Sequence, residues 1–329
     1  MFLKDLHHPN ICEVLFAYAE EYEQRYSLVF KFHSYDLEKI LYPKGNNHTS
    51  TPKPQGAQVQ FPGSKLENWI WKGFLGIIDA VAAVHDPQNF VTSIPKSNSH
   101  RLVGGHFDIK PANIIIDDNG VFLLTDFGQA YFKNVKIGEE SNLTINGGTY
   151  NYRPPPRYSR ERAEQTDNVE TKNKWTRAYD IWSLACVSVE IIAFIIEGVD
   201  AADKFFEERQ LEDAEDFGKF WTGSNGAPML KKCVQTRLNR YKSLGDKYLN
   251  RVVKQIEDMF KINELVPITA KACLQSFSAS VEVDRYIFQA DDDDLVGGAG
   301  TFRPFEKMYV CVIYQHQLLY MFNHITGPR

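Results

Sequence analysis

Along the N-terminal part of the chain, apolar positions follow strand spacing first and helical spacing afterwards. Residues 11–22 and 25–32 are rich in aromatic and β-branched residues and flank a polar turn, which predicts two paired strands. A short helix is predicted from Asp36 ("DLEKIL"), and apolar residues at helical spacing predict a long helix over 65–85. Residues 43–64 lack an apolar period and are rich in Pro, Gly, Ser and Asn, so we expect a disordered surface loop there.

The later apolar runs are short, apart from one long segment. Ile114–Ile116 and Val121–Leu124 are predicted strands of a hairpin, because an Asp-Asp-Asn-Gly turn joins them. Ile181–Ile196 is apolar around nearly its whole circumference, contains Glu190 and is short for a membrane span, which favours a buried core helix. Amphipathic helices are predicted from there to about Phe277.

The C-terminal tail, residues 278–329, begins with the linker-like sequences "DDDD" and "GGAG". Its last part contains "KMYVCVIYQHQLLYMFN". This stretch is compatible with a strand pair, a docking element or translated intron sequence, and the sequence leaves these three interpretations open.

Composition narrows the class of protein. The chain has 329 residues, 43% hydrophobic and 24% charged, as expected for a soluble globular protein. A net charge of -5 argues against a general nucleic-acid binder. Five scattered cysteines without CxxC spacing predict reduced thiols in the cytoplasm or nucleus. The N-terminal sequence has no signal-peptide pattern, and we expect no membrane partner.

Four polar residues cluster around the predicted hairpin. Asn113 precedes its first strand and Asp126 follows its second, so the two should lie side by side at one mouth. Asp108 and Lys110 lie on the turn just before. Two carboxylates, an amide and an ammonium are what Mg²⁺-dependent phosphoryl transfer requires, because the metal bridges phosphate oxygens and a carboxylate orients the attacking hydroxyl.

Several motifs in order extend this pattern along the chain: "LHHPNI", "YSLVFKFHSYDLEKIL", "HFDIKPANIII", "DFG", "GGTYNYRPPP" and "YDIWSLACV". Together they resemble the protein kinase family over roughly residues 1–275. The resemblance implies an α+β, protein kinase-like fold: a remnant of the N-lobe β-sheet (1–35), then a mostly helical C-lobe (36–277) with insertions at 43–64 and 86–101. Lys110 follows the Asp as in Ser/Thr kinases, and the insertions are similar to those of divergent filamentous-fungal members.

The resemblance implies roles for individual residues, with ATP, Mg²⁺ and a protein bearing Ser or Thr as ligands. Asp108 corresponds to the catalytic base, Lys110 to the γ-phosphate contact, and Asn113 and Asp126 to the metal ligands. The adenine pocket is implied to consist of the gatekeeper Phe30, the backbone of Lys31 and His33, and Ile115 beneath the base. The residues implied to support the site are Asp180 below the catalytic loop and the stacked spine Leu3, Val14, Phe127 and His106.

The sequence also departs from the family pattern. The Gly-rich loop, strand-three lysine and helix-C glutamate of the family have no counterpart before "LHHPNI". We therefore expect an N-terminally truncated kinase that binds ATP weakly and turns over slowly, with an orphan hairpin over 11–32 that exposes an edge.

Three further departures are local. Phe107 replaces the arginine that would pair with a phosphate on Ser141 or Thr144. Pro156 and Pro267 replace both members of a buried ion pair. Losing both partners of such a pair can be nearly neutral, whereas losing one leaves a buried charge.

Two other functions are compatible with some of these features. A pseudokinase or scaffold module would keep the C-lobe without turnover, and Mg²⁺-dependent nucleotide binding would test for it. A small-molecule phosphotransferase of the aminoglycoside type shares the HxD…N loop but lacks the counterparts of "GGTYNY" and "DIWS". The sequence therefore favours a protein Ser/Thr kinase.

Overall fold

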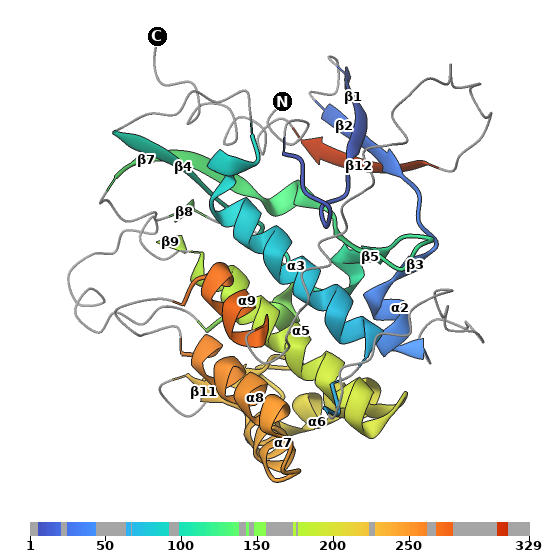
Figure 1. The fold of residues 1–329 in the computed structure, drawn as a ribbon, viewed down its shortest axis with the longest axis vertical. Coiled ribbons are helices and arrows are strands. Elements are labelled where there is room, and N and C mark those ends of the chain that lie inside the picture. Colours follow the sequence, from blue (N-terminus) through green and yellow to red (C-terminus); the bar gives the residue numbers. More distant parts are fainter. Residues whose placement is uncertain are drawn as a thin grey trace.

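The chain is described by a computed structural model in which the longer strands lie at one end and most helices fill the other (Figure 1). This α+β arrangement agrees with the fold class expected from the sequence. The structure describes residues 6–20, 25–43, 64–66, 68–91, 99–137, 143–144, 148–155, 174–175, 177–223, 228–261, 268–278 and 308–314.

The first sheet combines strands from both ends of the chain. β1 (Val14–Glu20) and β2 (Arg25–Lys31) form the antiparallel hairpin that was predicted from the aromatic and β-branched residues on either side of a polar turn. β12 (Met308–Tyr314), from the C-terminal tail, pairs antiparallel with β2, giving the strand order β1-β2-β12 (Figure 1). The expectation of an orphan hairpin is therefore wrong, because β2 has a partner on both sides. Of the interpretations left open for the tail, a strand is present at 308–314.

A second sheet holds the hairpin at the centre of the sequence motifs. β5 (Ile114–Ile116) and β6 (Phe122–Leu124) pair antiparallel as predicted, and β3 (Tyr35–Asp36) adds to β5. The Asp117 carboxylate closes the turn by accepting the backbone N–H groups of Asn119 and Val121. Short-range turn chemistry therefore fixes this hairpin.

A third strand pair was not predicted. β4 (His100–Gly105) begins in the expected insertion at 86–101 and pairs antiparallel with β7 (Tyr131–Lys136), for which the sequence predicted no strand. Polar residues interrupt both strands, but their apolar residues Leu102, Val103 and Phe132 are almost fully buried. The pair matters for the site because the strands lead into and out of the two polar motifs.

Two long helices form the centre of the helical part. α3 (Trp69–His85) begins where the Asn68 side chain accepts the Ile70 N–H at 2.8 Å, a standard N-cap. α5 (Ala178–Glu197) is buried at every residue as far as Ala193, which confirms the predicted core helix. It is long and apolar enough to cross a membrane, but most of it is buried inside the protein.

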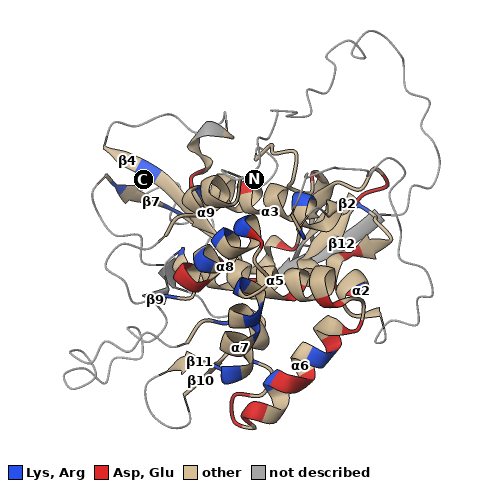
Figure 2. Cartoon of the chain, turned by 60° about the horizontal axis from the view of Figure 1, so that its bottom comes forward, with Lys and Arg blue, Asp and Glu red and all other residues tan. Residues whose placement is uncertain are grey.

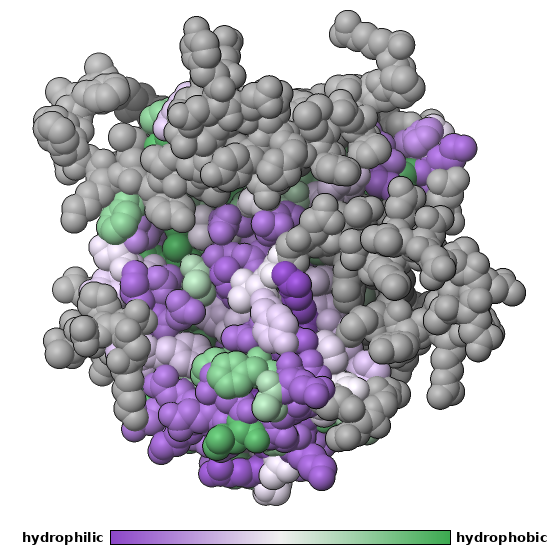
Figure 3. Space-filling view, turned by 180° about the vertical axis from the view of Figure 1, so that it is seen from behind, coloured by the Kyte–Doolittle hydropathy of each residue, from purple (hydrophilic) through white to green (hydrophobic). Residues whose placement is uncertain are grey.

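The remaining helices pack around this centre. α5 contacts α3, α6 (Ala201–Glu212) and α8 (Lys247–Met259), and α9 (Ala270–Ser278) packs on α3 and α8. Both signs of charge occur along α6 (Figure 2). The coloured residues of the face in Figure 3 are mostly hydrophilic, with small apolar patches. The other short elements are α2 (Leu37–Leu41), α7 (Lys232–Lys242), η3 (Pro87–Asn89), η4 (Pro111–Asn113), η5 (Phe127–Gln129), η6 (Tyr150–Tyr152), and the strand pairs β8 (Leu143–Thr144) with β9 (Lys174–Trp175) and β10 (Trp221–Thr222) with β11 (Met229–Leu230).

Candidate active site

The loop that follows β4 is held by one buried carboxylate. Asp180, fully buried in the first turn of α5, accepts the backbone N–H of His106 at 2.8 Å and that of Phe107 at 2.7 Å. The His85 ring lies 2.9 Å from the same carboxylate. Phe107 has φ 61°, a backbone conformation that costs energy for a non-glycine residue. The implied position of Asp180 below this loop is confirmed, and the two hydrogen bonds that its carboxylate accepts hold the strained turn.

Asp180→Asn is expected to lower the free energy of unfolding by about 1–3 kcal/mol. One of the backbone N–H groups of His106 and Phe107 would then face the amide nitrogen of the asparagine and lose its acceptor. Chemical denaturation measures the loss. Asp79→Asn is the matched control, since the Asp79 side chain is 50% exposed opposite His8 and its change is expected to be small. Similar losses in both variants would contradict the bracing role.

Asp108 lies at the centre of a converging set of donors. Its Oδ2 accepts the Lys110 ammonium and the Asn113 amide, both at 2.9 Å. Its Oδ1 accepts the backbone N–H and the hydroxyl of Thr149, both at 2.7 Å. Burial opposes ionisation, but the Thr149 hydroxyl and Lys110 outweigh it and hold the pKa of the Asp108 carboxyl below its usual value. The carboxylate is therefore ionised and oriented at neutral pH.

Thr149 is the residue that sequence reasoning missed. Its hydroxyl also accepts a hydrogen bond from Lys110 at 2.7 Å, so it bridges the base and the cation. It follows Gly148, whose φ of 92° and close approach to the Tyr179 hydroxyl leave no room for a side chain. Thr149 is part of the "GGTYNY" motif, but nothing in the local pattern shows a contact with a residue 41 positions earlier.

The ends of the hairpin strands meet as the sequence predicted. The N–H of Thr125, the residue before Asp126, donates to the Asn113 carbonyl at 3.0 Å, and the His106 ring lies 3.0 Å from the Thr125 carbonyl. Asp126 itself has φ 58° and accepts the Gly128 N–H at 3.3 Å. The two implied metal ligands, Asn113 and Asp126, therefore lie at neighbouring ends of β5 and β6.

The donor set at these strand ends suits Mg²⁺. The Asn113 amide nitrogen donates to Asp108, so the side-chain oxygen of Asn113 is the atom left for a metal. Mg²⁺ prefers such oxygen ligands and takes only one or two protein groups when phosphates supply the others. Within the described residues, no group of three or more His, Cys, Asp or Glu is arranged for a metal.

The residues implied for the adenine side lie where β2 ends. Phe30 is 1% exposed at the end of β2, and His33 follows it half-buried. Burial lowers the pKa of His33, although neighbouring Asp117 and Asp118 oppose this shift. Ile115 is half-buried between two fully buried isoleucines, so its face of the hairpin is the less covered one.

The implied spine is described in part. The rings of His106 and Phe127 lie 4.8 Å apart in an edge-to-face contact, and Val14 is buried. Leu3 lies outside the described residues.

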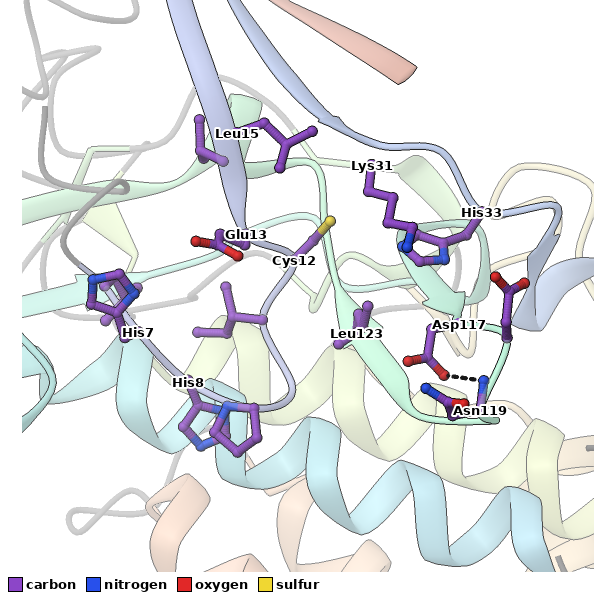
Figure 4. Close-up of a pocket in the computed structure, with 15 residues that line it drawn as sticks. His7, His8, Cys12, Glu13, Leu15, Lys31, His33, Asp117, Asn119 and Leu123 are labelled. Carbon is purple, nitrogen blue, oxygen red and sulfur yellow. Dashed lines mark hydrogen bonds between the residues drawn. The ribbon is translucent and has the colours of Figure 1, made fainter. Parts of the chain in front are cut away.

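A pocket of about 600 Å³ lies between the start of β1, the residues after β2 and the β5–β6 turn (Figure 4). Its lining includes Cys12, Lys31, His33, Asp117 and Leu123. None of the four clustered polar residues lines it. We therefore place the candidate active site at the Asp108 cluster, where the groups needed for chemistry converge.

Phe107, which replaces an arginine of the family pattern, has an apolar environment. Its ring lies 5.8 Å from that of Tyr179, edge to face, and the two form a small buried cluster with Tyr131. Thr144 lies in β8. The other residues named for these departures, Ser141, Pro156 and Pro267, lie outside the described part of the chain.

The comparison with known proteins decides the family. A family model described as "Protein kinase domain" matches residues 1–211, more than half of the chain. The chain belongs to the protein kinase family. It is 24% identical over 254 residues to the dual specificity protein kinase zak2 of Dictyostelium discoideum, covering 71% of this chain and 34% of that protein. It is 24% identical over 284 residues to the cell division control protein 2 homolog 3 of Trypanosoma brucei brucei, covering 83% of this chain and 74% of that protein.

Among solved structures, the chain is similar to a chain of the yeast RNA Pol II CTD kinase CTDK-1 complex. The TM-score is 0.45 at 18% identity, covering 83% of this chain and 76% of that chain. The kinase spans about a third of the length of the Dictyostelium relative.

Proposed function

We propose that this kinase transfers the γ-phosphate of Mg·ATP to Ser or Thr hydroxyls of a protein substrate. The observation that carries the proposal is the ionised Asp108 carboxylate, fixed by Lys110, Asn113 and Thr149 at the mouth of the hairpin. A positioned carboxylate within hydrogen-bond reach of a hydroxyl serves as its general base. Lys110 after Asp108, as in the Ser/Thr members of the family, supports the Ser/Thr assignment.

Each residue has a part in this reaction. Asp108 accepts the proton of the substrate hydroxyl and orients its oxygen, and Lys110 offsets charge on the transferred phosphoryl group. Asn113 and Asp126 would hold Mg²⁺, which neutralises phosphate charge when it is bound. Thr149 keeps Asp108 and Lys110 in place through its hydroxyl. We propose the cytoplasm or nucleus as the location, supported by the free thiols of Cys12, Cys186, Cys233 and Cys273, the cysteines whose side chains the structure describes.

The test is phosphotransfer from labelled ATP to peptides that contain Ser, Thr or Tyr as the single acceptor. We expect Mg²⁺-dependent labelling of Ser and Thr peptides, abolished by a chelator. Labelling of Tyr peptides at a similar rate would contradict the Ser/Thr assignment. Binding of Mg·ATP without labelling of any peptide would favour a scaffold module.

Thr149→Val is expected to shift the acid limb of the pH–rate profile to higher pH. The Thr149 hydroxyl is one of the groups that lower the pKa of Asp108, so its removal raises that pKa and the carboxylate protonates at a higher pH. The profile of kcat/KM against pH measures the shift. Thr149→Ser, which keeps the hydroxyl, is the control, and equal profiles for both variants would contradict the assignment.

The sign for stability follows from the same shift. A lowered pKa in the folded state means that ionised Asp108 stabilises the fold above its unfolded pKa. This contribution is lost as the pH falls through the folded pKa.

A further inference from the structure

The strand β12 comes from the far end of the chain but pairs with β2 along its whole length. The register runs from Met308 opposite Lys31 to Tyr314 opposite Arg25, without a bulge. Residues 279–307 connect α9 to this strand. A longer connection adds little to the cost of closing a loop, about 0.6 kcal/mol for each doubling of its length. Pairing within one chain is therefore entropically accessible.

β2 is the strand that needs this partner. Its residues Leu28, Val29 and Phe30 are 1–2% exposed, and its backbone would otherwise present one unpaired edge. A two-stranded hairpin is marginally stable in water, whereas three strands with a buried face are much more stable. β12 therefore stabilises the strand that carries Phe30, ends at Lys31 and leads to His33.

β12 also lies near the side of the candidate nucleotide site that carries Asp126. Its Cα atoms approach those of η5 to within 8 Å, and η5 begins directly after Asp126. The strand is therefore a neighbour both of β2, which carries Phe30 and Lys31, and of the motif that carries an implied metal ligand.

We propose that β12 is an integral strand of the nucleotide-binding lobe, and that its pairing with β2 is required for binding of Mg·ATP. This inference rests on the proposed kinase function, and it assigns a role to the C-terminal tail. A tail strand that covered the site and blocked the nucleotide would produce the opposite effect on affinity, so the two are separable by measurement.

A crosslinking experiment on the full chain tests the pairing by itself. Cys311 is the register partner of Leu28, and directly opposite residues of antiparallel strands lie within disulfide reach. Oxidation of the Leu28→Cys variant should therefore give a 28–311 disulfide, detected by peptide mapping without reductant. Val29→Cys is the matched control, because neighbouring strand residues project to opposite faces. Equal crosslinking of both variants would overturn the pairing.

A second crosslink guards against a folding defect from changing buried Leu28. Ser27 lies opposite Val312, is 1% exposed, and its hydroxyl has no hydrogen-bond partner. In the double variant Ser27→Cys with Val312→Cys, the cysteine at position 27 has nearly the volume of the serine that it replaces. This variant should form a 27–312 disulfide. Failure of both crosslinks in folded protein would overturn the inference.

The functional part is tested by titrating a fluorescent ATP analogue with Mg²⁺. In the full chain carrying Val310→Pro and Cys311→Pro, one of the two adjacent N–H groups must face β2, so a ladder hydrogen bond is lost. We expect affinity to fall by about tenfold or more. The control, Val310→Thr with Val312→Thr, keeps β-branched residues and should bind like wild type.

The outcomes separate the two proposals. Unchanged or tighter binding by the proline variant would overturn the role of β12 and leave the kinase function intact. Absence of nucleotide binding by the wild-type chain would overturn the proposed function and the nucleotide role of β12 with it, whereas the crosslinks would still decide whether the strands pair.

Discussion

Arg209→Met is expected to destabilise the folded chain by about 3–5 kcal/mol, because it leaves the Glu190 carboxylate buried without its ion-pair partner. The Arg209 guanidinium lies 2.9 Å from the Glu190 carboxylate, and the two side chains are 1% and 0% exposed. It also lies over the rings of Phe205 and Phe220, 4.4 and 4.1 Å from their centroids. Methionine packs well against aromatic rings, so the main loss is that of the charge.

Two further variants make this prediction specific. Arg240→Met is the matched control, because the Arg240 side chain is 63% exposed beside Glu197 and such pairs contribute about 0–1 kcal/mol. Glu190→Leu combined with Arg209→Met should recover part of the loss, since removing both charges of a buried pair is often neutral. Urea denaturation followed by tryptophan fluorescence measures all three. Equal losses in Arg209→Met and Arg240→Met would contradict the argument.

The Glu190–Arg209 pair also connects the core to the active site. The other oxygen of Glu190 accepts the Tyr152 hydroxyl at 3.0 Å, and Ser183 donates to the Tyr152 carbonyl at 3.0 Å. Burial raises the pKa of Glu190 against the opposing effect of Arg209 and two tyrosines. Tyr152 is three residues after Thr149, so this buried network fixes the segment that holds Asp108 in place.

Local patterns predicted the elements whose signal is contained in a few consecutive residues. The helical period gave α3 and α5, and the Asp-Asp-Asn-Gly turn gave the β5–β6 hairpin. The approach of Asn113 to the end of β6 followed from that hairpin alone, because strand pairing brings its two ends together.

The features that the sequence did not predict depend on contacts between distant residues. β4 and β7 both contain polar residues between their apolar ones, which hides the strand pattern in the sequence. The two strands are hydrogen-bonded to each other. β12 pairs with residues near the other end of the chain, and no local signal specifies that partner. The contact of Thr149 with Asp108 depends on where the segment after Gly148 packs. The Glu190–Arg209 pair depends on the packing of α5 against α6. The sequence shows these residues but not their partners.

Asp108→Asn is expected to lower kcat by about 10²–10⁴-fold, the usual effect of losing a positioned general base. The two carboxylate oxygens accept four hydrogen bonds, from Lys110, Asn113 and the N–H and O–H of Thr149. An asparagine side chain is not basic, so it cannot accept the proton of the substrate hydroxyl. Its amide nitrogen would also face one pair of these donors, which would move the side chain out of position. The residues implied to bind adenine are untouched, and Mg·ATP affinity should therefore change little.

Phosphotransfer rates and nucleotide titrations on the same preparations separate these two effects. Asp118→Asn is the matched control, since Asp118 is an exposed residue of the β5–β6 turn and the same chemical change there should leave kcat unaltered. If wild type and Asp108→Asn bind Mg·ATP equally well but only wild type is active, the protein is a kinase with Asp108 as its base. Equal turnover by the two would show that another group accepts the proton, and would remove Asp108 from the mechanism.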